Sequence, residues 1–345
     1  MNQRDFTMTS ISRIRYAMEN NRLVIFVGAG VSKNSGLPDW NDLVQAFASE
    51  IGFSNKDKLT KLLSILTDEQ KEEFKPILSK IKNFSIDEYL KIPQYYSVKY
   101  GDFAYEEKVR KILKGSNKPN PIDYLIFDLN PVHIITTNYD NLLENAASLK
   151  GLNYSTVSND KSLALADSNK LIIKMHGDFD KFVLKESDYD TYSNNFKLIE
   201  TYVKGLIATN TILFVGFSAD DANVRKIFQW IKDILGEYQN PAYILNIDDV
   251  KNSEEKEKIL VKCDYLEKIK INTLFYDEIE KEIDAFVTND IIKKYSQNVE
   301  IKIKPDNKFG LKLFKMLYYI RYQDENPDES NAIKYYYEIL KELSV

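Results

Sequence analysis

The stretch "LVIFVGAGVSKNSG", Leu23–Gly36, joins an apolar run to two glycines that are separated by a single residue. The run Leu23–Val27 is typical of a buried strand in a parallel sheet, because every side chain in it is apolar. A glycine-rich turn directly after such a strand lets backbone N–H groups approach a phosphate. The residues that this turn is expected to place against a phosphate are Gly28, Ala29, Gly30 and Ser32.

The turn departs from the usual dinucleotide-binding fingerprint. That fingerprint has a third glycine three residues after the second, and this position is Lys33 here; the next glycine is Gly36. The acidic residue that would hold a ribose about 20 positions further on is also missing, because Glu50 lies in a helical pattern. The turn is therefore not an ordinary dehydrogenase loop. A strand-to-helix turn that merely needs glycine remains an alternative.

Short apolar runs recur along the chain and are separated by helical patterns. Strands alternating with helices predict an α/β fold with a Rossmann-like, doubly wound and mostly parallel sheet. A weaker candidate, Ile269–Tyr276, alternates in a way that suits an edge strand. The other expected strands are His133–Thr137, Leu171–Met175, Thr211–Val215 and Ala242–Ile247.

The spacing of these strands also predicts a domain organisation. Far more residues separate the first two strands than one crossover helix needs, so we expect a helical insertion at about residues 53–130 within a main domain of residues 1–290. Residues 291–345 read as a helical extension of two helices. Because such a pair cannot bury its own apolar stripe, it either packs back on the main domain or begins a longer helical region.

The composition favours a protein that binds a small ligand. The 345 residues carry a formal net charge of −5, which gives no reason to expect nucleic acid or an anionic membrane as a partner. No apolar run has the length of a membrane span and the first residues lack a signal-peptide core, so we expect a cytoplasmic protein. The single cysteine, Cys263, cannot build a four-cysteine zinc site, so no zinc is expected.

Polar motifs follow several of the expected strands. "NYD" holds Asn138 and Asp140, "HGD" begins with His176, and "GFS" holds Gly216 and Ser218. The carboxyl ends of parallel strands meet at one edge of the sheet, where ligands bind in open α/β folds. The sequence therefore predicts that these motifs and the glycine turn share one site.

Each motif also has a plainer interpretation. His176 is suited to proton transfer near neutral pH, whereas His133, inside an expected strand, is interpreted as a packing residue. Asp140 can contact a ligand or simply cap the helix that follows it. The pair Gly216 and Ser218 can make a second close approach of backbone to ligand, or only a turn.

Taken in order, the motifs resemble those of the sirtuin-like family over roughly residues 10–280. The matching segments are "GAGVSKNSGLPDW", "TTNYD", "MHGD", "VGFS" and "YILN". Two departures narrow the resemblance: the cysteines of the zinc module are missing, and Asn41 stands where sirtuin deacylases have an arginine. With the long helical insertion, the pattern resembles bacterial sirtuin-like effectors of anti-phage defence, especially the defence-associated sirtuins.

The resemblance implies an enzyme that cleaves NAD to nicotinamide and ADP-ribose and so aborts infection. It implies catalytic roles for Asn138 and His176, with the glycine turn and Asp140 among the residues that bind NAD. The adenosine half is expected at Gly216, Ser218 and Asn246. The resemblance also implies a homo-oligomer and a phage-derived or partner-protein trigger. A non-catalytic module that binds NAD or ADP-ribose, and a zinc-free ADP-ribosyltransferase or deacylase, are the alternatives.

Overall fold

The computed structural model describes residues 2–53, 64, 66–71, 86–114, 118–179, 181–217, 222–247 and 253–323. Its strands are β1 (Leu23–Val27), β2 (His133–Thr136), β3 (Ser155–Val157), β4 (Leu171–Lys174), β5 (Thr211–Val215), β6 (Ala242–Asn246) and β7 (Ile271–Phe275). The helices before β4 are α1 (Gln3–Glu19), α2 (Ala29–Ser32), the 3-10 helix η1 (Lys33–Ser35), α3 (Trp40–Ile51), α6 (Ile86–Tyr100), α7 (Asp102–Leu113), α8 (Pro121–Asp128), α9 (Leu142–Leu149) and α10 (Asp160–Ala164). The helices after β4 are α11 (Glu186–Asp190), α12 (Tyr192–Asn195), α13 (Lys197–Thr209), α14 (Ala222–Leu235), the 3-10 helix η2 (Gly236–Tyr238), α15 (Ser253–Lys268), α16 (Glu280–Phe286), α17 (Asn289–Tyr295) and α18 (Lys308–Tyr322).

The strands form one sheet of seven in the order β3-β4-β2-β1-β5-β6-β7. Every pairing in it is parallel, which confirms the predicted Rossmann-like α/β fold. The chain runs from β1 to one side for β2 and later returns to the other side for β5, so the topological switch point lies between the ends of β1 and β5. The edge position predicted for the last strand is confirmed by β7.

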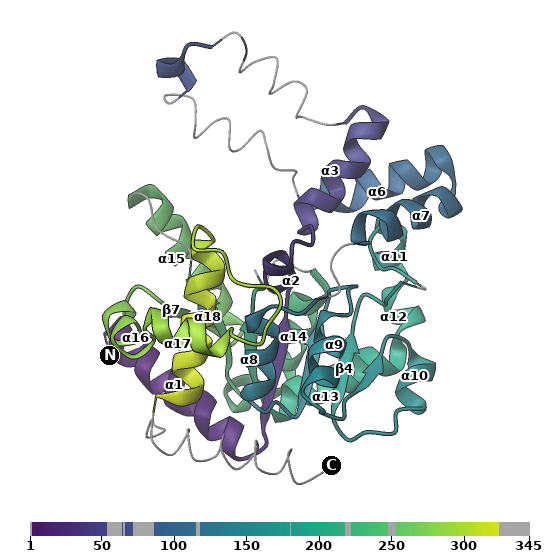
Figure 1. Ribbon diagram of the computed structural model, residues 1–345. Helices are drawn as coiled ribbons and strands as arrows, with labels where there is room; N and C mark the ends of the chain where they lie inside the picture. Colours follow the sequence, from purple (N-terminus) through teal and green to yellow (C-terminus); the bar gives the residue numbers. More distant parts are fainter. Residues whose placement is uncertain are drawn as a thin grey trace, which may run out of the picture.

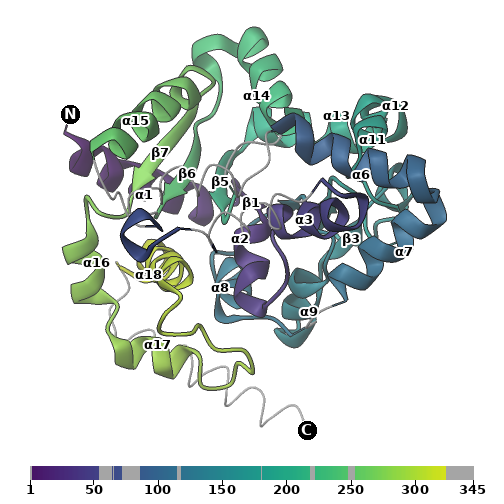
Figure 2. The same ribbon diagram turned by 90° about the horizontal axis from the view of Figure 1, so that it is seen from above.

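The two faces of the sheet are both covered, as the alternation along β1 shows. Leu23, Ile25 and Val27 belong to the core on one face, while Val24 and Phe26 belong to the core on the other. The first core is shared with α1, α8, α9, α16 and α18, and the second with α13 and α14. Turning from the view of Figure 1 to that of Figure 2 shows α8 and α9 on one side of the strands and α13 and α14 on the other. All five β1 side chains are buried, as expected for a central strand.

A third, smaller core lies beyond the carboxyl edge of the sheet. It joins α3, α6 and α7 through residues such as Phe47, Tyr96 and Tyr105, and it takes in Tyr139 and Phe182 from loops that follow β2 and β4. Figures 1 and 2 show these helices grouped together beside α2. The helical region therefore covers the loops in which the polar motifs lie. The predicted bounds of the insertion remain a prediction.

The first helix of the extension, α18, packs back on the main domain. Leu313, Phe314, Met316 and Leu317 are all fully buried in the core that covers one face of the sheet. Arg321 also donates from Nε to the backbone oxygen of Asp128 at the end of α8, at 2.7 Å. The second predicted helix begins after residue 330 and lies outside the described residues, and the division of the chain at residue 290 remains a prediction.

Candidate active site

The glycine turn after β1 is packed against the turn after β5. The N–H of Gly28 donates to the Val215 oxygen and the N–H of Gly30 to the Gly216 oxygen, both at 2.9 Å. A Cβ on Gly28 would lie 2.5 Å from the Gly216 oxygen, and one on Gly216 would lie 2.7 Å from the Val31 nitrogen. The three glycines are thus required by the contact between the two turns. Our expectation that the N–H groups of this turn face a phosphate differs from this arrangement at Gly28 and Gly30, because the oxygens of Val215 and Gly216 already accept these two N–H groups.

Side chains buried behind the turn link it to the motif after β2. The Nδ2 of Asn138 donates to the Ser32 Oγ at 2.9 Å, and that hydroxyl donates to the Asp140 Oδ2 at 2.7 Å. The other carboxylate oxygen of Asp140 accepts from the Leu142 N–H at the start of α9. Asp140 therefore bonds to the first residue of α9, whose N-cap is Asn141, and also anchors the glycine turn. All three polar residues are buried.

Lys174, the last residue of β4, is a buried residue that the sequence reasoning missed. Its side chain is 1% exposed and pairs with Glu144 at 2.7 Å. Its ammonium also donates to the backbone oxygen of Asp140 at 2.6 Å and to the Asn141 Oδ1 at 3.0 Å. Burial raises the pKa of Glu144, and the Lys174 ammonium opposes that rise. We call Ser32, Asn138, Asp140 and Lys174 the polar layer, since together they hold the loop after β2 against the glycine turn.

His176 follows β4 and is held in a tight turn. Its carbonyl accepts from the Val183 N–H at 2.9 Å, and Gly177 adopts a φ of +79° that favours glycine. A Cβ on Gly177 would collide with the backbone oxygen of Lys181. The imidazole is only 1% exposed. Its ring centre lies 5.4 Å from that of Tyr189 and 6.3 Å from that of Trp40.

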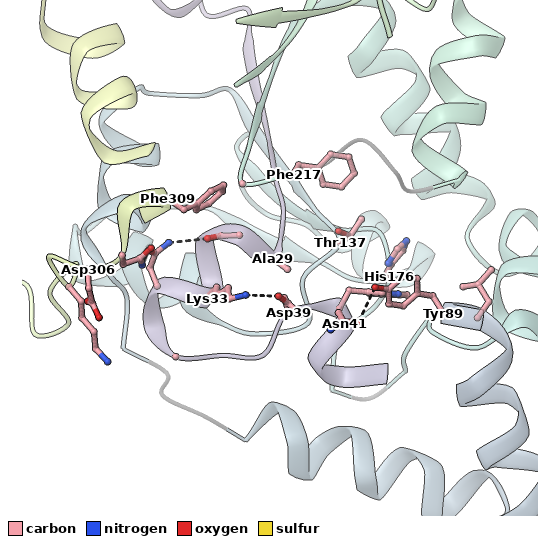
Figure 3. A pocket seen from close by; sticks show the side chains of 18 of the residues that line it. Ala29, Lys33, Asp39, Asn41, Tyr89, Thr137, His176, Phe217, Asp306 and Phe309 are labelled. Atoms are coloured by element: carbon pink, nitrogen blue, oxygen red, sulfur yellow. Dashed lines mark hydrogen bonds and ion pairs between the residues drawn. The ribbon is translucent and has the colours of Figure 1, made fainter. Parts of the chain in front are cut away.

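A pocket of about 1030 Å³ opens in front of the glycine turn. Ala29, Gly30 and Gly216 line its floor, and His176 lines it together with the rings contributed by α3, α6 and α11. Figure 3 shows Ala29 and Lys33 in the middle, with His176, Asn41 and Tyr89 on one side and Asp306 and Phe309 on the other. The structure therefore brings the glycine turn and the histidine into one cavity at the topological switch point.

The pocket also holds an ion pair, which lies beside the glycine turn. The Nζ of Lys33 lies 2.6 Å from an oxygen of Asp39, the residue that caps α3. Burial raises the pKa of Asp39, but the hydrogen bonds from Lys33 and from the Asp42 N–H outweigh it, so the pKa lies below its usual value. Both groups are thus charged near neutral pH. Lys33, which breaks the dinucleotide fingerprint, supplies a cation at the mouth of the site.

The other predicted site residues lie at different distances from this cavity. Ser32, Asn138 and Asp140 belong to the polar layer behind it and are not among its lining residues. Asn246 ends β6, where its backbone oxygen accepts from the Tyr276 N–H, and it is likewise not among the lining residues. Ser218 lies outside the described residues. The packing interpretation of His133 agrees with its half-buried ring beside Tyr202.

Several pocket residues were not singled out from the sequence. Tyr89 and Tyr189 lie on α6 and α11, and Asn307 and Phe309 lie at the start of α18. The three aromatic residues do not stand out among the many tyrosines and phenylalanines, and Asn307 lies in no motif that follows a strand. Within the described part of the chain, no cluster of His, Cys, Asp and Glu is placed to hold a metal ion. Likewise, no described helix is long and apolar enough to span a bilayer.

Comparison with known proteins identifies a domain in this chain. The model of the SIR2-like domain matches residues 132–274, which include the motifs after β2, β4 and β5. The chain carries a SIR2-like domain. Defense-associated sirtuin 2 of Bacillus subtilis is 34% identical over 245 residues, which are 69% of this chain and 22% of that protein. NAD(+) hydrolase ThsA of Enterococcus faecium is 30% identical over 243 residues, 68% of this chain and 45% of its own length.

These relatives are longer than this chain, which therefore spans less than half of either one. A solved structure of Sir2 in complex with an inhibitor, 2'-O-acetyl-ADP-ribose and a p53 peptide is 13% identical to this chain. It covers 74% of the chain with a TM-score of 0.35, a similarity too distant to inform the site.

Proposed function

We propose that the SIR2-like domain of this chain hydrolyses NAD to nicotinamide and ADP-ribose. The observation that carries this proposal is the position of His176, a buried imidazole that lines the same pocket as the glycine turn. The names of two relatives support it, since one is a defence-associated sirtuin and the other an NAD(+) hydrolase. A role as an abortive-infection effector in anti-phage defence is part of the same proposal.

For this reaction the protein needs to position the water and the ribose and to accept one proton. The bond between the nicotinamide nitrogen and ribose C1′ breaks, and its electron pair neutralises the pyridinium, so the leaving group needs no acid. Water adds to C1′ and loses a proton. We assign that proton to the His176 imidazole, which receives it directly or through a ribose hydroxyl. Holding water and ribose in line supplies a further part of the rate enhancement.

The remaining assignments follow from the arrangement around the turn. Ala29 and Gly30 face the cavity and, with Gly28 and Ser32 behind them, are proposed to hold the pyrophosphate. Asn138 is proposed to position the ribose or the water, and its location in the polar layer means that it also supports the turn. Gly216, Ser218 and Asn246 are proposed for the adenosine half, and Asp140 for support of the binding turn.

The proposal is tested by a matched pair of histidine variants, since the chain has only two histidines. His176→Ala is expected to lower nicotinamide release from NAD by about 10²- to 10⁴-fold, the usual contribution of a general base. His133→Ala removes the ring beside Tyr202, away from the pocket, and is expected to keep the activity. Equal activity of both variants, with thermal melts showing both folded, would contradict the assignment.

Product analysis separates this proposal from its alternatives. Chromatography of the reaction is expected to show free ADP-ribose and nicotinamide in equal amounts. Modified protein would indicate an ADP-ribosyltransferase, and lysine deacylation would indicate a deacylase. Binding of ADP-ribose without turnover, both with and without lysate from phage-infected cells, would indicate a regulatory module.

We further propose a cytoplasmic homo-oligomer that is activated by a phage-derived or partner-protein component. The support is the likeness to a defence-associated sirtuin. Light scattering of the purified protein is expected to give a mass that is at least twice the 40.1 kDa of one chain. A monomer that hydrolyses NAD at full rate without any added component would contradict this part of the proposal.

A further inference from the structure

The C-terminal end of the described chain forms one wall of the pocket. Asp306, Asn307 and Phe309 line the cavity, although they lie well beyond the matched SIR2-like residues 132–274. Phe309 is part of α18 and is packed against the core on that face of the sheet. In Figure 3 it lies on the opposite side of Ala29 from His176. The pocket therefore has a histidine end and a Phe309 end, with the glycine turn between them.

A side-chain bridge fixes the Phe309 end to the glycine turn. Asn307 caps α18 by accepting from the Gly310 N–H at 3.0 Å, and its Nδ2 donates to the Asn34 Oδ1 at 2.6 Å. The amide nitrogen of Asn34 in turn donates to the Gly30 oxygen at 2.9 Å. A Cβ on Gly310 would collide with the Asn34 side chain. The start of α18 and the glycine turn thus form one rigid unit.

The order of the groups in NAD determines which part of the molecule lies at the Phe309 end of the pocket. If the bond to nicotinamide is cut beside His176 and the pyrophosphate lies over the glycine turn, the remaining part of the molecule is adenosine. It must then extend past the turn toward Phe309. A second ring, Phe217, also lines the cavity and is stacked on Phe214 at 5.2 Å between ring centres. Flat aromatic faces bind nucleobases by stacking.

We propose that Phe309 is the residue that recognises the adenine ring of NAD, and that Asn307 is a positioning residue that holds the Phe309 wall against the glycine turn. This inference rests on the proposed function, because the orientation of NAD is taken from the cleavage at His176. It makes α18 a part of the substrate site. Selection of a whole dinucleotide over a substrate that lacks adenosine then depends on the start of α18.

The test compares two substrates in two Phe309 variants. Loss of one stacked base by alanine substitution corresponds to about a 5- to 150-fold change in affinity. Phe309→Ala is therefore expected to raise the KM for NAD by about that factor. It should leave cleavage of nicotinamide mononucleotide, which lacks adenosine, unchanged. Phe309→Tyr keeps the ring and should restore the KM for NAD. Phe309→Leu keeps the apolar packing and serves if the alanine variant fails to fold.

The matched controls separate binding from folding. Phe103 is 81% exposed on α7, so Phe103→Ala should behave as the parent chain. Asn307→Asp keeps an acceptor for the Gly310 N–H but removes the donor to Asn34, so α18 stays capped while the bridge breaks. This variant should raise the KM for NAD with an unchanged kcat. Equal effects of Phe309→Ala on both substrates, or no effect on either, would overturn the inference.

Calorimetry with ADP-ribose distinguishes the failure of this inference from that of the proposed function. If the parent chain releases no nicotinamide but binds ADP-ribose, and Phe309→Ala weakens that binding, the adenine site stands and the hydrolase proposal falls. If the parent chain hydrolyses NAD and the affinity for ADP-ribose is the same in both proteins, the hydrolase stands and the adenine site falls.

Discussion

The polar layer behind the glycine turn and the pocket in front of it differ in the side chains that form them. The layer consists of buried polar side chains that bond to one another: Ser32 to Asp140, Asn138 to Ser32, and Lys174 to the loop between them. The pocket is lined by rings, by small residues and by polar groups that include the Lys33–Asp39 ion pair, with His176 at one end and Phe309 at the other. Both regions include residues from motifs that the sequence places directly after strands, such as Asn138 in the layer and His176 in the pocket.

The difference shows that neighbouring residues of one motif can belong to two different parts of the site. In "NYD", Asn138 and Asp140 face the layer, while the ring of Tyr139 joins the helical core above the site. Buried polar groups that lose a partner cost more free energy than exposed ones. Changes in the polar layer should therefore lower stability together with activity, whereas changes in the pocket should lower activity alone.

The largest effect is expected from Lys174→Met. Removing this cation leaves Glu144 and several oxygens buried without their donor, and breaking a buried ion pair costs about 3–5 kcal/mol. Denaturant unfolding monitored by circular dichroism measures that loss. Lys204→Met is the control, because its pair with Glu200 lies within α13 and its lysine is 25% exposed, against 1% for Lys174. Equal losses of unfolding free energy in both variants would show that the polar layer stabilises the fold no more than the control pair does.

Ser32→Ala should have the next largest effect. The hydroxyl donates to Asp140 and accepts from Asn138, so both groups lose a buried partner, at a cost of about 1–3 kcal/mol. NAD hydrolysis should fall as well, since the glycine turn loses its tie to the motif after β2. Ser12→Ala, whose hydroxyl is on an exposed part of α1, controls for helix propensity. If Ser32→Ala kept full stability but lost activity, Ser32 would act on the substrate in the pocket and not as a support in the polar layer.

Lys33→Ala tests the pocket side. The lysine is 57% exposed, so its pair with Asp39 contributes about 0–1 kcal/mol to folding. Its cation lies beside the turn proposed to hold the pyrophosphate, so the KM for NAD should rise about tenfold, the equivalent of roughly 1.4 kcal/mol. Steady-state kinetics measures this change. Lys150→Ala, which breaks a pair with Asp128 far from the pocket, should leave the KM unchanged.

The smallest effect concerns pH and a residue outside both regions. Burial lowers the pKa of His133 below 6.5, and the charge of Lys170 lowers it further. The folded protein therefore favours the neutral ring. The resulting stabilisation is complete above pH 6.5 and is lost as the pH falls through the lower pKa of the folded state. The free energy of unfolding should decline less on acidification in His133→Asn than in the parent chain, and identical pH profiles would contradict this assignment.

Much of the sheet could be predicted from local sequence. The run Leu23–Val27 is uniformly apolar and Thr211–Val215 is apolar after its threonine, and the structure has strands with these same bounds. β3 was missed because it is a strand of three residues, Ser155–Val157, with a single buried side chain. Such a segment becomes a strand only because β4 offers its edge.

The sequence predicted several residues of the candidate site, but it did not predict how they are arranged. The sequence places Gly30, His176 and Gly216 after parallel strands, and they do line one cavity. Lys174 was hidden by its position at the end of an apolar strand, where a lysine usually reaches solvent. Its partners come from another strand's loop, so no local pattern reveals that it is buried.

By itself, the sequence determined the strands, the turns between strand and helix, and the sheet edge at which the motifs gather. These depend on apolar runs and glycines that act over a few residues. Only the tertiary structure decided which face each motif presents, that Gly28 packs on Gly216, and that Asn34 meets Asn307 across 273 positions of sequence. The reason is physical: a buried hydrogen bond forms only where packing brings donor and acceptor together, and spacing along the chain does not specify that meeting.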